Sequence, residues 1–320
     1  MDGFRIPIGE WAAAAVGWVK DNLEGLLDFI SFIVKFLVNG LTDVLLGTPI
    51  VILIVIAALI AWSVRSIWMA LGTAVSFALI LSMGLWVAAM QTLSLVVVAA
   101  LVAVVIAIPL GIWSARNATV RAILKPILDF MQTMPAMVYL IPAIVFFSIG
   151  VVPGLVATVI FALPPGVRMT ELGIRGVDSE TVEAGHAFGA TPGQILRGIQ
   201  LPLAMPTIMA GVNQVIMLSL SMAVIAGMAG ADGLGKLVVE AIATVNIGKG
   251  VEAGLAVVLL AVFLDRVTAA LGTPGEFSSS LFGMMARRRG AQQAGKADAA
   301  ADAERAVASP HRAPIGGGTA

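Results

Sequence analysis

Long runs of apolar residues recur along this chain and restrict the folds that it can adopt. A helix needs about 20 apolar residues to cross the hydrocarbon of a bilayer, with a lower limit near 17. Backbone polar groups in lipid must also be satisfied inside the segment, which favours helices. The runs are Thr48–Val64, Ser66–Met90, Thr92–Trp113, Leu128–Ile149, Pro153–Arg168, Leu203–Gly227 and Val251–Leu271. We therefore predict an all-α polytopic membrane protein with about seven transmembrane helices.

Prolines and short connections predict where these helices bend or end. Gln91 alone separates the second run from the third. Pro109 should bend the third run near its end, and Pro135 and Pro142 should break or kink the fourth. The fifth run should end around Pro164-Pro165.

Composition agrees with a membrane protein and excludes several kinds of chemistry. Of the 320 residues, 59% are hydrophobic and 12% charged, values outside the range of soluble domains. The net charge is zero and there is no cysteine, so we expect no nucleic-acid partner, disulfide or thiolate metal site. Of the two histidines, His186 and His311, neither has a second nearby histidine for a metal site. We expect no catalytic, cofactor or metal site, and hence not an enzyme.

Residues 1–47 differ from the runs that follow, because a polar stripe interrupts them at helical spacing. One wet face at this period is typical of an amphipathic helix lying along a membrane, and Trp11 and Trp18 suit the interface. The alternative is a crossing helix whose polar residues face partners. The stripe consists of Lys20, Asp21, Glu24, Asp28, Ser31, Lys35, Asn39 and Asp43. We predict a membrane-surface helical segment, followed at 48–90 by two accessory transmembrane helices.

Basic residues predict the orientation. With the N-terminus outside and seven crossings, most lysines and arginines fall on the cytoplasmic side, including Arg116, Arg121, Lys125 and Arg197. This bias follows the positive-inside rule and puts the C-terminus in the cytoplasm. Residues 284–320 are rich in Ala, Gly and Arg without apolar period, and we predict a disordered cytoplasmic tail.

The longest polar island, residues 178–206, predicts two short helices joined at a tight corner. Asp178 or Ser179 can cap the first helix. Gly189 is placed to end it in a left-handed conformation. Thr191 begins the second helix, with Pro192 at its first position and Gln194 at the capping-box spacing. Pro202 and Pro206 should close the unit before the next apolar run.

The motif in this island resembles the "EAA" coupling loop of ABC-importer permeases, which docks into a partner ATPase. It consists of Glu183, Ala184, Gly185, Gly189, Ile199, Leu201 and Pro202. Gly185 stands where the motif has a second alanine, and glycine costs about 1 kcal/mol inside a helix, so the first helix should be less rigid. The bland alternative is an ordinary polar loop.

Two further stretches, Leu128–Leu140 and Gln200–Gln214, resemble the permease subunit of glycine betaine/proline ABC importers. The likeness covers roughly residues 93–271. It implies a MetI-like ABC importer permease core at 91–272, and residence in a bacterial cytoplasmic membrane. It also implies a second permease copy, a cytoplasmic ABC ATPase pair that binds ATP and Mg²⁺, and an external substrate-binding protein. The implied function is ATP-driven uptake of compatible solutes for osmoprotection.

Polar residues within the runs are costly in lipid and are candidates for a translocation path. Asn213 and Gln214 cannot share one helix face, so at most one of them lines a path while the other bonds a neighbouring helix. For each candidate, helix–helix bonding is the alternative role. The candidates are Gln132, Tyr139, Asn213, Gln214 and Ser221.

Other functions remain open at this point. A permease for another small solute, such as choline or an amino acid, would share every motif. A stand-alone secondary carrier would need buried ionisable groups or internal repeats, and a membrane scaffold or sensor would leave the coupling loop unexplained. Gly230–Leu237 approaches a phosphate loop, but Leu237 stands where Mg²⁺ needs a hydroxyl. Energy must therefore come from a separate chain.

Overall fold

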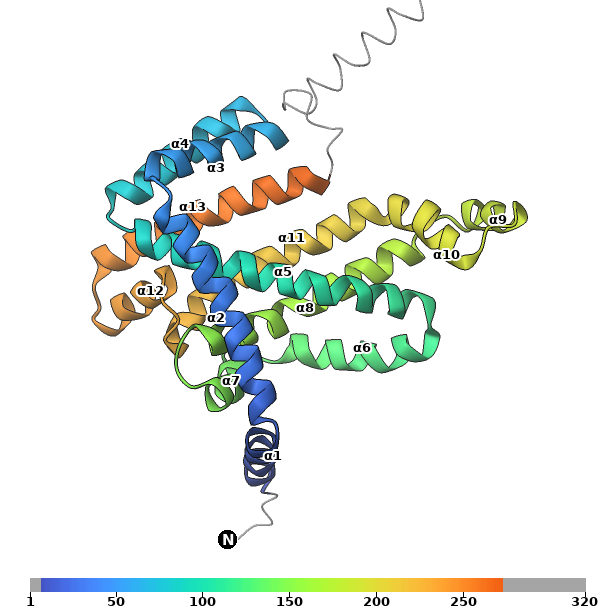
Figure 1. Ribbon diagram of the computed structural model, residues 1–320, viewed down its shortest axis with the longest axis horizontal. Coiled ribbons are helices and arrows are strands. Elements are labelled where there is room, and N and C mark those ends of the chain that lie inside the picture. The colour runs from blue at the N-terminus through green and yellow to red at the C-terminus, as the bar shows by residue number, and fades with distance from the viewer. Residues whose placement is uncertain (1–6, 273–320) are drawn as a thin grey trace, which may run out of the picture.

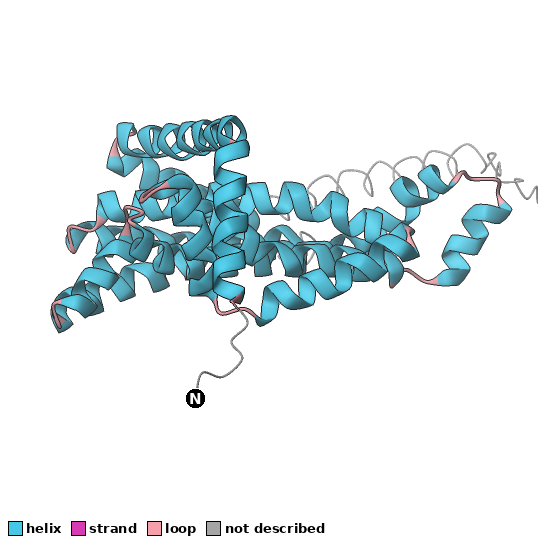
Figure 2. Cartoon of the chain, turned by 90° about the horizontal axis from the view of Figure 1, so that it is seen from below, coloured by secondary structure: helices cyan, strands magenta, loops and turns pink. Residues whose placement is uncertain are grey.

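The computed structural model describes residues 7–272, and every regular element within them is a helix (Figure 1). The cartoon in Figure 2 shows the same helices joined by short loops. The predicted tail at 284–320 lies outside the described residues. The principal helices are α1 (Ile8–Asn22), α2 (Glu24–Gly47), α3 (Ile50–Val64), α4 (Ile67–Ser82), α5 (Trp86–Arg116), α6 (Ala118–Thr133), α7 (Leu140–Phe147), α8 (Val151–Arg175), α9 (Ser179–Ala187), α10 (Pro192–Ile195), α11 (Leu201–Ala226), α12 (Leu234–Ala243) and α13 (Ile247–Gly272).

The centre of the fold is a layer of three long helices, in which α8 packs between α5 and α11. Small residues let these backbones approach closely, as membrane helices require. A methyl group added to Gly166 would lie 2.8 Å from Ala107 Cβ and 3.0 Å from Val215 Cγ2. One added to Gly111 would lie 2.5 Å from Thr170 Cβ. The core is therefore specified by the absence of side chains as much as by apolar burial.

The fourth predicted span is broken, as Pro135 predicted. Helix α6 ends at Thr133, and the chain bends by 107° between α6 and the segment Ala136–Phe147. This segment consists of a short 3₁₀ turn, Ala136–Tyr139, and α7. Pro135 lacks an amide hydrogen and cannot continue the α6 ladder. Pro142 lies in the first turn of α7, where its missing donor costs nothing.

The predicted boundary at Gln91 is wrong. Helix α4 ends at Ser82, and residues 86–116 form one helix that contains Gln91. Gly84 has φ +71°, and the amides of Gly84 and Leu85 bond the carbonyls of Leu81 and Ile80, a helix ending that favours glycine. A lone glutamine leaves the backbone ladder intact, so it does not stop a helix.

The predicted end of the fifth span at Pro164-Pro165 is also wrong, because α8 continues through both prolines to Arg175. Both prolines are buried. Packing against α5 and α11 therefore offsets the hydrogen bonds that the two missing amides would have made.

Within residues 7–272, five helices are long and apolar enough to cross a membrane, or six when the bent pair α6–α7 is counted as one span. The all-α polytopic fold is confirmed, although this number is below the seven predicted. The predicted accessory spans correspond to α3 and α4, which have 15 and 16 residues. At 1.5 Å per residue they extend only about 22–24 Å, short of the roughly 30 Å hydrocarbon thickness.

Helix α2 is one of the five apolar helices, although the sequence predicts a membrane-surface segment there. Figure 1 shows α2 running across α5 and α8 instead of alongside them. Helix α1 leads into it and contacts α7. The surface placement of this segment stays a prediction, and the transverse course of α2 is compatible with it.

Candidate functional site

Helices α9 and α10 project from one end of the three-helix layer, at the right of Figure 1. Helix α9 follows the end of α8, and α10 leads back into α11. The polar island is therefore attached directly to two of the three central helices, so a force applied to it is passed into the core of the bundle.

The corner between α9 and α10 has the predicted capping. The Asp178 side chain accepts a hydrogen bond from the Glu180 amide at 3.3 Å. Gly189 has φ +78°, its amide bonds the His186 carbonyl, and the Ala190 amide bonds the Gly185 carbonyl. These two bonds form a Schellman motif, which fixes the exit direction of the chain.

The start of α10 carries the predicted capping box. The Gln194 amide donates to Thr191 Oγ1, and Gln194 Oε1 accepts from the Thr191 amide at 2.8 Å. Both helices at the corner thus have defined, capped ends, although each helix is short.

The lower rigidity expected at Gly185 stays a prediction, and the structure shows that Gly185 is buried at a helix contact. A methyl group there would lie 2.7 Å from Ile199 Cδ1 and 3.4 Å from Ile195 Cγ1. The glycine lets α9 lie against the chain that follows α10, and the packing offsets its helix cost.

The predicted end of the unit before the sixth span is wrong as well. Residues 196–200 form a π-helical segment, η2, that joins α10 to α11 without a break. Pro202 cannot donate to the Gly198 carbonyl, and its ring crowds that carbonyl in a regular α-helix. The wider π turn relieves this conflict, so α10, η2 and α11 form one continuous helical segment.

The outward surface of the corner combines charge with one bare aromatic ring. Glu183 and Ala184 are exposed, and Phe188 is 93% exposed at the end of α9. Phe188 was not among the residues predicted for the coupling loop. Its signal was an aromatic residue in a polar island, directly before the glycine that turns the chain.

Among the candidate path residues, Asn213 forms hydrogen bonds between two helices. Its Nδ2 donates to Asp265 Oδ1 at 3.0 Å, and its Oδ1 accepts from Thr268 Oγ1 at 2.5 Å. These bonds tie α11 to α13, and they match the helix–helix alternative for this residue.

The other four candidates lie in two settings. Gln132, Gln214 and Ser221 are exposed on the described chain. Tyr139 is buried, packs edge-on against Phe161 with ring centroids 6.1 Å apart, and donates its hydroxyl to the Met131 carbonyl. The structure does not gather all five into one pocket.

Comparison with known proteins decides the family. Residues 107–273 match the family model of the binding-protein-dependent transport system inner membrane component. The chain belongs to this family. The match covers α6 to α13, including the whole α9–α10 corner.

Curated relatives extend the likeness beyond the family core. The chain is 46% identical to the glycine betaine/proline betaine transport system permease protein ProW of Escherichia coli (strain K12), over 83% of this chain and 75% of that protein. It is 48% identical to the glycine betaine transport system permease protein OpuAB of Bacillus subtilis (strain 168), over 82% and 94%. Members of the family are transport components in the inner membrane, and this chain is a multi-pass permease of that kind.

A solved structure supports the fold. The inward-facing MetNI methionine ABC transporter is similar with a TM-score of 0.54 and 23% identity, over 59% of this chain and 94% of that chain. The MetI-like architecture of the core is thereby confirmed.

Proposed function

We propose that this chain is the permease subunit of an ATP-driven importer for compatible solutes such as glycine betaine and proline betaine. The main support is the capped α9–α10 corner, which lies at the start of the continuous helical segment α10–η2–α11. Relatives with 46% and 48% identity over more than four fifths of the chain are named as betaine permeases.

The corner can act mechanically without any chemistry of its own. An ATPase that grips Phe188 and the exposed face of α9 would move α10 and, through η2, α11. Because α8 packs between α11 and α5, this movement would shift α8 and so open and close a path along that helix. ATP and Mg²⁺ would be bound by the ATPase pair, and an external binding protein would deliver the solute.

Selection of the solute would lie with that binding protein. Quaternary ammonium groups are held by open aromatic faces through cation–π attraction. Tyr139 is largely buried, packs edge-on against Phe161 and donates its hydroxyl to the Met131 carbonyl, and one ring does not make an aromatic cage. Purified permease–ATPase complex should therefore bind glycine betaine only weakly on its own, and micromolar affinity there would contradict this.

A second permease copy and an N-outside, C-inside orientation complete the proposal. Helices α5 and α6 meet at the end of the bundle that carries α9 and α10 (Figure 1). Arg116 is the last residue of α5, and Arg121 and Lys125 lie in the first half of α6. A reporter inserted at Thr119 should report cytoplasm, and one at Gly235 the outside. The reverse pattern would overturn this orientation and remove the corner from the reach of an ATPase.

The direct test of the solute is transport. The chain would be reconstituted with its ATPase and binding protein in liposomes, and uptake of labelled glycine betaine measured with and without internal ATP. We expect ATP-dependent uptake that unlabelled proline betaine inhibits. Inhibition by choline or an amino acid alone would instead support the permease for another small solute.

A further inference from the structure

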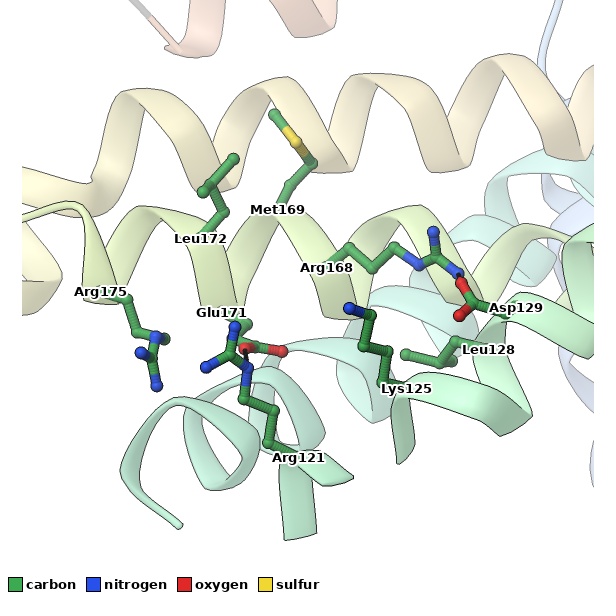
Figure 3. A pocket seen from close by; sticks show the side chains of 9 residues that line it. All are labelled: Arg121, Lys125, Leu128, Asp129, Arg168, Met169, Glu171, Leu172 and Arg175. Atoms are coloured by element: carbon green, nitrogen blue, oxygen red, sulfur yellow. Dashed lines mark hydrogen bonds and ion pairs between the residues drawn. The ribbon is translucent and has the colours of Figure 1, made fainter. Parts of the chain in front are cut away.

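A cavity of about 280 Å³ lies between α6 and α8 (Figure 3), and its nine lining residues comprise six charged ones together with Leu128, Met169 and Leu172. We call it the α6–α8 furrow. Its charged residues are Arg121, Lys125 and Asp129 on α6 and Arg168, Glu171 and Arg175 on α8. The residues on each helix are spaced by three or four, so each set forms one stripe along its helix. Four bases and two acids give the furrow a surplus of two positive charges.

The furrow extends back from the end of α8 by about two helical turns. Arg175 is the last residue of α8. Arg168 lies seven residues before it, about 10 Å further along the helix axis. Its partner Asp129 lies eleven residues into α6. The side chains of Arg168 and Asp129 are 39% and 52% exposed.

Such exposure is incompatible with lipid on this face. A charged side chain facing the hydrocarbon costs about 2.5–3.5 kcal/mol on insertion scales. The adjoining part of α6 offers the contrast, since Ile123 and Ile127 are apolar and 58% and 48% exposed. Helix α6 therefore has one face suited to an apolar environment and one that needs water.

The two ion pairs that cross the furrow differ in their support. Arg121 Nε lies 2.8 Å from Glu171 Oε1, and the other Glu171 oxygen accepts from the buried Ser114 hydroxyl at 2.8 Å. Glu171 on α8 is thereby bonded to both α5 and α6, and this pair stabilises the packing of the three helices. Arg168 Nη2 lies 2.5 Å from Asp129 Oδ1, with no further support described and more exposure to water. An exposed pair contributes only about 0–1 kcal/mol, so this contact can open.

Lys125 and Arg175 have no ionic partner within residues 7–272. Two unpaired cations at a helix interface keep their hydration, because dehydrating them without a partner costs several kcal/mol. They favour a furrow that stays filled with water.

We propose that the α6–α8 furrow is the water-filled cytoplasmic half of the solute path, and that the Asp129–Arg168 ion pair is a latch that closes it. This inference rests on the proposed importer function, and it adds the path, the closing contact and the residues that form them. Gln132 follows Asp129 on α6 and continues the polar stripe toward the bend at Pro135.

The absence of cysteine provides a clean test. Lys125→Cys would be compared with Ile123→Cys and Ile127→Cys, which flank it on the other face of α6. Each variant of the complete permease–ATPase complex would be treated in nanodiscs with a charged, membrane-impermeant thiol reagent. We expect Lys125→Cys to react at least about tenfold faster than both controls, and more slowly after trapping with ATP and vanadate.

Equal rates at the three positions would overturn the furrow as a water path. An inert Lys125→Cys would also overturn it, because the furrow would then be covered by lipid or by the second copy. A rate unchanged by trapping would overturn the closing movement. If the parent complex imports glycine betaine in any of these cases, the importer function stands and only the furrow assignment fails.

The latch itself is tested by exchanging its charges. Asp129→Asn and Arg168→Gln should each lower the uptake per ATP hydrolysed by about fivefold, the equivalent of an exposed ion pair. The double variant Asp129→Arg/Arg168→Asp should recover part of this loss. Normal coupling in both single variants, or a double variant no better than either, would contradict the latch.

Discussion

Gly185 and Ile199 lie so close together that a methyl group on Gly185 would stand 2.7 Å from Ile199 Cδ1. This contact holds α9 against η2 and explains why glycine replaces the second alanine of the coupling motif. Gly185→Ala should therefore push α9 away from η2 and weaken coupling, although alanine is the better helix former. Coupling is measured as glycine betaine uptake per ATP hydrolysed.

The matched control shortens the partner side chain. Ile199→Val removes Cδ1, so the double variant Gly185→Ala/Ile199→Val has room for the new methyl group. We expect the double variant to couple better than Gly185→Ala alone. If Gly185→Ala alone gives the same uptake per ATP hydrolysed as the parent protein, the close contact is not needed for coupling.

Asn213 bonds Asp265 and Thr268 on the neighbouring helix. Asn213→Ala would leave the half-buried Asp265 carboxylate without its amide donor. We expect a loss of about 1 kcal/mol, the range seen for interhelical hydrogen bonds in membranes, and thus a melting temperature lower by about 2–4 °C in detergent. Gln214→Ala is the control, because this adjacent side chain is exposed and should leave the melting temperature unchanged. Equal shifts in the two variants would contradict the structural role of Asn213.

Glu240 on α12 accepts a hydrogen bond from Lys249 Nζ at 2.6 Å, which holds the pKa of the Glu240 carboxyl below its ordinary value of 4.5. A lowered pKa in the folded state stabilises the fold above the ordinary value, and this stabilisation is lost as the pH falls through the lowered pKa. Amide exchange protection at the α12–α13 junction should therefore drop as the pH falls below the ordinary value of 4.5 toward the lowered pKa. Glu240→Gln should remove this dependence, and a drop of the same size in that variant would assign the effect to another group.

Local signals in the sequence predicted the corner well. The left-handed Gly189 and the capping box at Thr191 and Gln194 depend on residues within a few positions of one another, so they can be recognised without tertiary information. Pro135 was informative for the same reason, since its missing amide breaks a helix wherever nothing compensates.

Features that depend on packing were mispredicted or missed. Pro164 and Pro165 do not end α8, because contacts with α5 and α11 hold the helix through them. Gly84, and not Gln91, separates α4 from α5, because backbone geometry ends a helix and a single polar side chain does not. The furrow joins Asp129 to Arg168, 39 positions apart, and only the packing of α6 on α8 reveals that pair.

We propose that energy from a separate ATPase enters this chain through the α9–α10 corner, and the variant Gly189→Val tests this coupling. Valine is strongly disfavoured at φ +78°, so the corner should be distorted in this variant. We expect the variant still to assemble with its ATPase. The measurement is glycine betaine uptake per ATP hydrolysed in proteoliposomes containing the complete complex. We predict uptake by the parent only with ATP, and a ratio at least about tenfold lower in the variant while ATP hydrolysis continues. A ratio unchanged by Gly189→Val, or uptake driven by an ion gradient without ATP, would contradict it.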